Sequence, residues 1–108
     1  MKEYLGRCAE NLRYAVRHLA SSSGTAQEKL TGMYNDTAFG SIDEGDFTEG
    51  YLKDNYLIVR GSLVKACEPN AAVNIAAMSD EQALRVIKQV CLLSEAVAYA
   101  LGRQSNSS

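Results

Sequence analysis

The segment from Ser79 to Gly102 carries the signals of one long amphipathic helix. It begins with the capping box S-D-E-Q, in which the first and last side chains each satisfy a backbone amide that lacks a partner inside the helix. Gly102 is expected to end the helix. Between these signals an apolar stripe recurs at helical spacing, with one serine in it: Ala83, Val86, Ile87, Val90, Cys91, Ser94, Val97, Ala98 and Leu101. Such a stripe needs other helices to cover it, which favours an all-α fold.

Helical signals recur along the rest of the chain. A second stripe runs through residues 2–20, and a capping box at Thr25, T-A-Q-E, begins a helix that reaches about Ala38 and is closed by Gly40. The further predicted helices span residues 47–67 and, with Pro69 in its first turn, residues 69–77. These segments predict an all-α four-helix bundle with one additional short helix before the C-terminal helix. We expect one helical domain over residues 1–103 and a disordered tail over residues 104–108.

Composition limits the class of protein. The chain has 108 residues, of which 46% are hydrophobic and 22% charged, as in a single globular domain. Its formal net charge of −2 provides no overall positive field for nucleic acid. No apolar run has the length of a signal peptide or a membrane span, so we expect a cytoplasmic protein with no membrane contact.

The cysteines predict neither a disulfide framework nor a metal site. Cys8, Cys67 and Cys91 are odd in number and form no C-x-x-C pair. They are therefore expected to be reduced thiols, and Cys8 and Cys91, which fall on the apolar stripes, are expected to pack as small apolar side chains. We predict no cofactor, no metal and no catalysis.

A line of residues on the last predicted helix points to a second contact surface. Leu92, Ala96 and Tyr99 share one side of this helix, outside the main stripe and within a charged sector. The helix over residues 47–67 is also apolar on more of its circumference than one bundle core can cover. These three residues are therefore the predicted partner-binding site, and the partner is another protein or a second copy in a homodimer.

A polar row on the first predicted helix is a second candidate. Arg7, Asn11, Tyr14 and His18 follow one another along one side. Arginine, histidine and tyrosine side chains presented together can bind a phosphate or a carboxylate, so this row is a possible ligand- or partner-binding site. The acidic segment over residues 43–49 lacks the ligand spacing of a calcium loop and is interpreted as a solvated connection.

Two resemblances give alternative functions. Residues 69–89 resemble a helix-turn-helix unit, which implies a DNA-binding regulator that uses this corner. Asp80 and Glu81 begin its second helix, where a phosphate backbone repels them, so we do not expect nucleic acid as a partner. Arg13 and His18 satisfy R-x4-H and resemble HEPN-type small helical ribonucleases in that spacing, which implies a ribonuclease that works through this pair. Five residues along one helix place the two side chains about 140° apart.

Taken together, these patterns predict a small intracellular protein-binding module without catalytic activity. It would act as a regulator, adaptor or inhibitor through contacts on its helix faces.

Overall fold

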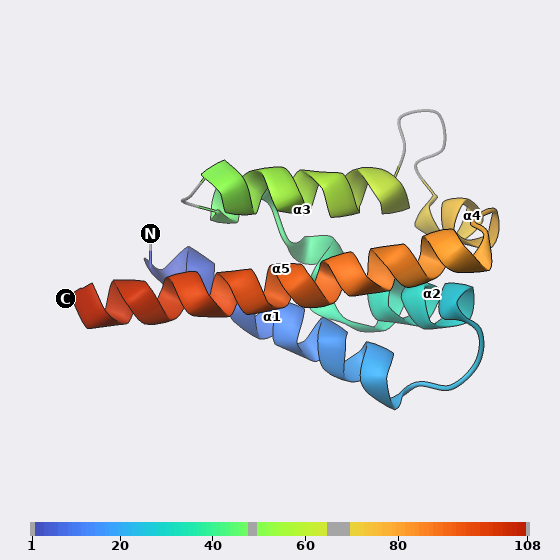
Figure 1. Ribbon diagram of the computed structural model, residues 1–108, viewed down its shortest axis with the longest axis horizontal. Helices are drawn as coiled ribbons and strands as arrows, with labels where there is room; N and C mark the ends of the chain where they lie inside the picture. The colour runs from blue at the N-terminus through green and yellow to red at the C-terminus, as the bar shows by residue number, and fades with distance from the viewer. Residues whose placement is uncertain (1, 48–49, 65–69, 108) are drawn as a thin grey trace.

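The computed structural model describes residues 2–47, 50–64 and 70–107, and within these ranges it contains helices and no strand. The α-helices are α1 (Lys2–Ser21), α2 (Ala26–Asp36), α3 (Gly50–Leu63), α4 (Ala71–Ala76) and α5 (Asp80–Ser107) (Figure 1). Two short 3-10 helices, η1 (Ala38–Ser41) and η2 (Glu44–Asp46), lie between α2 and α3. The prediction of an all-α bundle with a short helix before the last one is confirmed. None of the described helices is both long and apolar enough to cross a membrane.

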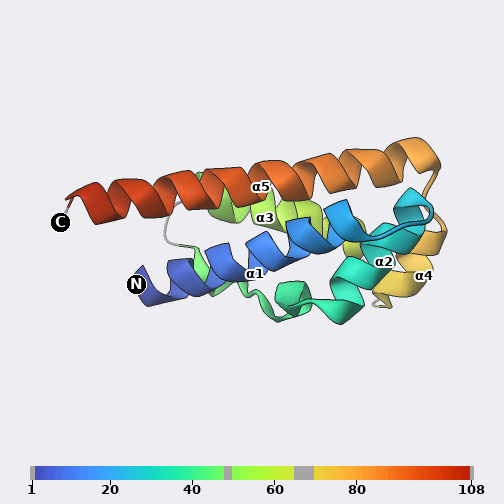
Figure 2. The ribbon, with the colours of Figure 1, turned by 90° about the horizontal axis from the view of Figure 1, so that it is seen from below.

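The longest helix, α5, organises the bundle. α1 packs along one side of α5 and α3 along another, and both run antiparallel to it (Figure 1). α2 and α4 pack against each other beside the beginning of α5 (Figures 1 and 2). Among the helices that the structure describes, α5 thus packs against α1, α2 and α3.

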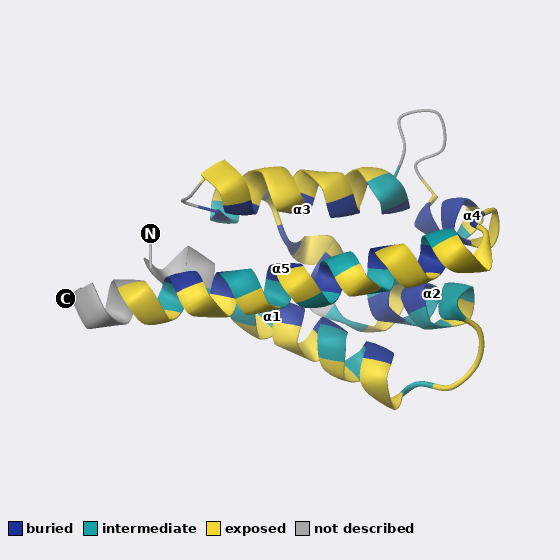
Figure 3. Ribbon diagram, in the orientation of Figure 1, coloured by how far each residue is buried: buried dark blue, intermediate teal, exposed yellow. Residues whose placement is uncertain are grey.

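The buried side chains of α5 follow a coiled-coil-like spacing. They alternate in steps of three and four residues: Ala83, Val86, Val90, Leu93, Val97 and Ala100. The buried residues of α1 follow the same steps: Cys8, Leu12, Ala15 and Leu19. A mean spacing of about 3.5 residues keeps two helices in contact along their length at a shallow crossing angle. Buried and exposed positions accordingly alternate along α5 (Figure 3).

We call this row of buried α5 residues the seam, and it differs from the apolar stripe predicted for α5. Leu93 and Ala100 were not part of the predicted stripe and are buried, whereas Ser94 is only partly buried and Ala98 is exposed. The predicted stripe covered too many positions, and its centre was rotated around the helix relative to the seam. The reason is that α1 and α3 pack on different sides of α5 and the seam lies between them. On α3, by contrast, the predicted buried residues Leu52, Tyr56, Val59 and Leu63 are all buried.

Capping explains where several helices begin. Thr25 Oγ1 accepts a hydrogen bond from the Glu28 amide, and the Glu28 carboxylate accepts one from the Thr25 amide, both at 3.1 Å, as the predicted capping box requires. Gly24 adopts φ = +108°, a conformation that favours glycine, in the turn between α1 and α2. Ser79 Oγ accepts from the Gln82 amide at 3.1 Å and begins α5.

Other predicted boundaries are wrong. α2 ends at Asp36 because the Thr37 hydroxyl donates to the Met33 carbonyl and accepts from the Phe39 amide, which starts η1 in place of another α-helical turn. α5 passes through Gly102 and continues to Ser107, because Gly102 does not take the positive φ with which glycine ends a helix. The backbone of residues 104–107, which was predicted to lie in a disordered tail, continues the helix.

Two further predictions concern the connection between α3 and α4. α3 spans Gly50–Leu63 and is shorter than the predicted helix over residues 47–67. The prediction for Pro69 lies outside the described residues, and α4 begins at Ala71, where the Asn70 side chain accepts from the Ala72 amide. The buried Asn74 side chain donates to the Leu63 carbonyl at 3.1 Å and so ties α4 to the end of α3.

The acidic segment before α3 is anchored by its apolar residues. Phe39, Ile42 and Phe47 are buried, and the Tyr56 hydroxyl donates to the Ile42 carbonyl at 2.5 Å. Burial raises the pKa of Tyr56 to about 12, so its hydroxyl stays protonated as a donor at neutral pH. The exposed carboxylate of Asp43 accepts a hydrogen bond from the Gly45 amide within the same turn. The apolar residues of this segment therefore cover part of the hydrophobic core. The pattern of acidic residues alone did not indicate this.

Candidate functional site

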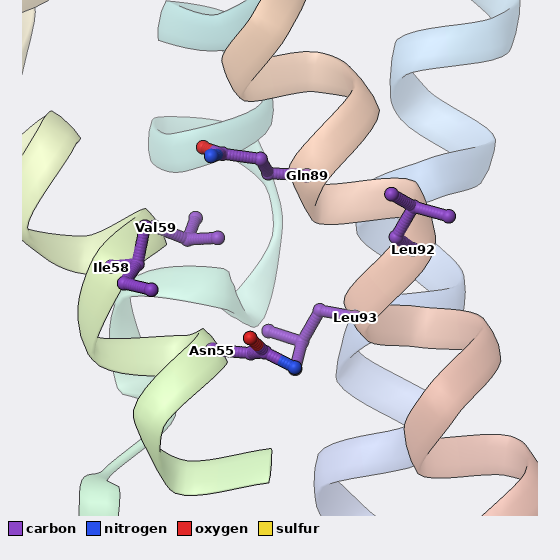
Figure 4. A pocket seen from close by; sticks show the side chains of 6 residues that line it. All are labelled: Asn55, Ile58, Val59, Gln89, Leu92 and Leu93. Carbon is purple, nitrogen blue, oxygen red and sulfur yellow. The ribbon is translucent and has the colours of Figure 1, made fainter. Parts of the chain in front are cut away.

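The predicted partner-binding residues lie on the outer side of α5. Leu92 is 53% exposed and Tyr99 is 67% exposed, which is high for large apolar side chains in a folded domain, while Ala96 is partly buried. Leu92 stays on the outer side of α5, whereas its neighbour Leu93 extends toward α3 (Figure 4). The exposure of Leu92 and Tyr99 agrees with their predicted position outside the main stripe.

A small pocket separates α3 from α5 at the level of Leu92. Its volume is about 150 Å³, and its lining residues are Asn55, Ile58, Val59, Gln89, Leu92 and Leu93 (Figure 4). Val59 and Leu93 are buried and form its base. Ile58, which is 55% exposed, and Leu92 supply apolar surface from the two sides. The pocket is therefore a shallow apolar depression with two amides at its margin.

An aromatic and cationic cluster lies farther along the same two helices. The Arg103 guanidinium donates to the Tyr51 hydroxyl at 3.4 Å and lies 5.3 Å from the centre of the Tyr99 ring. Tyr51, like Tyr99, is exposed. A guanidinium held against a tyrosine ring is a weak contact on an exposed surface. We call Tyr51, Ile58, Leu92, Ala96, Tyr99 and Arg103 together the α3–α5 face.

The polar row predicted on α1 is only partly brought to one site. Tyr14 and His18 line a second pocket, of about 380 Å³, between α1 and the end of α2. Arg7 is exposed and Asn11 is partly buried, and neither lines this pocket. The remaining lining residues, which the sequence did not single out, are Arg17, Ser21, Asp36 and Thr37. The ligand-binding role of the row stays a prediction.

His18 has a specific environment in this second pocket. Its Nε2 lies 3.5 Å from Asp36 Oδ2, and its Nδ1 is buried without a hydrogen-bond partner in the described structure. Gly32 lies against the ring, where a Cβ atom would approach His18 Cε1 to 2.7 Å. A glycine inside a helix costs about 1 kcal/mol relative to alanine, and at this position the absence of a side chain leaves room for the imidazole.

The two alternative functions receive no new support from these positions. Arg13 lies over the Tyr14 ring, at 5.8 Å from its centre, and does not line the pocket that contains His18. At the corner between α4 and α5, the Gln27 side chain of α2 donates to the Met78 carbonyl and to the Asp80 carboxylate, both at 2.9 Å. The start of the presumed recognition helix is thus attached to α2. Both alternatives stay predictions.

The described cysteines are free thiols with suppressed reactivity. Burial, assisted by the negative charge of Asp46, raises the pKa of Cys8 to about 12, and burial followed by the charge of Glu95 raises the pKa of Cys91. Both thiols therefore stay protonated at neutral pH, the form that is a poor nucleophile. Cys67 lies outside the described residues. Within the described ranges, no three side chains of the metal-ligating types come together.

Comparison with known proteins adds no assignment: no family model, curated protein or solved structure matches this chain.

Proposed function

We propose that this chain is a small helical protein-binding module that acts as a regulator, adaptor or inhibitor and binds its partner through the α3–α5 face. The observation that carries the proposal is the exposure of Ile58 and Leu92, each above one half, on opposite sides of one apolar pocket. Fully burying such a side chain stabilises a complex by roughly 1.5–3 kcal/mol, so the exposed half of each represents about 1 kcal/mol. The aromatic and cationic cluster adds tyrosine and arginine, the residue types that are enriched among the strongest contributors to protein interfaces.

The size of the pocket favours a protein over a small molecule at this face. Sites for small ligands enclose roughly 300–1,000 Å³, and the α3–α5 pocket has about 150 Å³. That volume accepts one inserted side chain. A partner that covers the whole face would place such a side chain between Ile58 and Leu92 and contact Tyr51 and Tyr99 around it.

The charge of the chain argues against a DNA-binding function. The chain has a formal net charge of −2, and the corner proposed for DNA carries Asp80 and Glu81 at the start of α5. A DNA-binding regulator would have to offset this repulsion with a local basic surface. A cytoplasmic location and the absence of catalysis stay predictions that accompany the proposal.

Changing Leu92 and Tyr99 together to glutamate is expected to abolish binding without unfolding the protein. Both side chains are exposed, so the charges are tolerated in the free chain, but they would be buried against a partner. In an extract of its source cells, the parent should elute from a size-exclusion column well above 11.7 kDa, and the double variant should elute as a free chain.

Val73→Glu provides the matched control. Val73 is 52% exposed, almost the same as Leu92, but it lies on α4, away from the α3–α5 face. This variant should elute with the parent. Elution of the parent as a free chain, or of the double variant with the parent complex, would refute the proposed function.

A further inference from the structure

The outer side of α5 is symmetric in its spacing about Leu92. Its line of positions is Glu81, Arg85, Lys88, Leu92, Ala96, Tyr99 and Arg103, in steps of four, three, four, four, three and four residues. Eleven residues make slightly more than three helical turns, so the two ends of the line share a face with its centre. Six of the seven residues are exposed, and Ala96 is partly buried. We call these seven residues the outer line of α5.

From this spacing we infer that the partner of the α3–α5 face is a second copy of the chain, which pairs through α5 in antiparallel orientation with Leu92 on the two-fold axis. The inference rests on the proposed function and names its partner. In this arrangement each position lies opposite the one equally distant on the other side of Leu92. Glu81 meets Arg103 of the second copy, and Arg85 meets Tyr99. Leu92 meets Leu92.

The charges of the line complement each other in this arrangement. Glu81 and Arg103 form an ion pair at each end, and each Arg85 guanidinium lies against a Tyr99 ring. Lys88 of one copy lies opposite Ala96 of the other. The aliphatic stem of Lys88 covers this small side chain, and the Lys88 ammonium reaches the exposed Glu95 of the other copy. A parallel pairing would place Glu81 against Glu81 and Arg103 against Arg103. The charge pattern therefore selects the antiparallel dimer.

Glu81 and Arg103 cannot form this ion pair within one chain. Glu81 and Arg103 are 22 positions apart on one helix, a distance of about 33 Å. Inside the chain, Glu81 contacts Arg85 at 3.6 Å, and Arg103 contacts Tyr51 and Tyr99. Both residues are exposed on the outer side of α5, where a second copy meets them.

Charge reversal at the two ends tests the pairing. Glu81→Arg, Arg103→Glu and the double reversal are compared with the parent by sedimentation equilibrium of the purified protein. The parent should sediment at twice the 11.7 kDa of one chain. Glu81→Arg should raise the dissociation constant by about tenfold or more, because it creates two like-charge contacts in each dimer. The same substitution made in the Arg103→Glu protein should instead lower the dissociation constant.

This change of sign is the decisive readout. Arg103→Glu also removes the contacts of Arg103 with Tyr51 and Tyr99, but that loss is common to the single and double variants. Glu81→Arg acting in the same direction in both backgrounds would overturn the antiparallel pairing. A parent that sediments as a single chain, while still eluting as a complex from the cell extract, would overturn the dimer and leave the proposed function standing.

Discussion

Replacing Leu93 by alanine is expected to lower the free energy of unfolding by about 2–5 kcal/mol. Leu93 is 2% exposed and lies in the middle of the α5 seam, so its removal leaves a cavity that α1 and α3 cannot close without moving. Folded domains are stable by only about 5–15 kcal/mol in total. The variant should therefore unfold at a much lower urea concentration than the parent.

The neighbouring Ser94 supplies the control. Ser94 is partly buried at the margin of the seam, and Ser94→Ala should change the free energy of unfolding by less than about 1 kcal/mol. Both variants are compared by urea unfolding followed by circular dichroism at one protein concentration, because the stability of a dimer depends on concentration. Equal losses at the two positions would mean that the seam is not centred on Leu93.

Replacing Gly32 by alanine is expected to stabilise the protein only when residue 18 is no longer histidine. In the parent, the new Cβ would lie 2.7 Å from His18 Cε1, so the partly exposed ring must leave its position, at a cost of about 1 kcal/mol that offsets the gain in helix propensity. In a His18→Ala background the obstacle is gone, and the same substitution should stabilise α2 by about 1 kcal/mol through helix propensity.

The measurement is a double-mutant cycle of unfolding free energies, in which the coupling between residues 18 and 32 should be at least about 1 kcal/mol. Additive effects would show that Gly32 is not needed to accommodate the imidazole. Gly6 serves as a control because a Cβ there would meet nothing within 4 Å. Gly6→Ala should be insensitive to residue 18.

The helices and their starts could be predicted because their causes are local. The capping box at Thr25 needs only the side chain of Glu28, three residues away, and the result is a hydrogen-bond pair seen in the structure. The seam of α5 was harder to place. Its register depends on where α1 and α3 pack, and an apolar stripe of ideal helical period does not distinguish Leu93 from Ser94. The predicted helix end at Gly102 was wrong, because a glycine ends a helix in this way when its backbone takes a positive φ, and Gly102 does not.

The candidate site likewise combines features that follow from the local sequence with features that depend on tertiary packing. The exposure of Leu92 and Tyr99 could be predicted, since their angular position on one helix follows from the sequence alone. Their association with Tyr51 and Ile58 of α3 depends on the tertiary packing of two helices about 40 residues apart, for which the sequence contains no local signal. Likewise, nothing local connects His18 with Asp36, which meets it only because α2 folds back against α1.

Crosslinking from position 92 shows directly whether a second copy covers the outer side of α5. The photoreactive residue p-benzoylphenylalanine is placed at position 92 in one purified protein and at position 73 in another, which have nearly equal exposure in the parent. Irradiation should yield a product of twice the 11.7 kDa chain mass from position 92, with the new bond to α5 of the second copy near its own residue 92, and little product from position 73. Equal yields from both positions, or the absence of a product from position 92, would mean that no second copy lies on this side of α5.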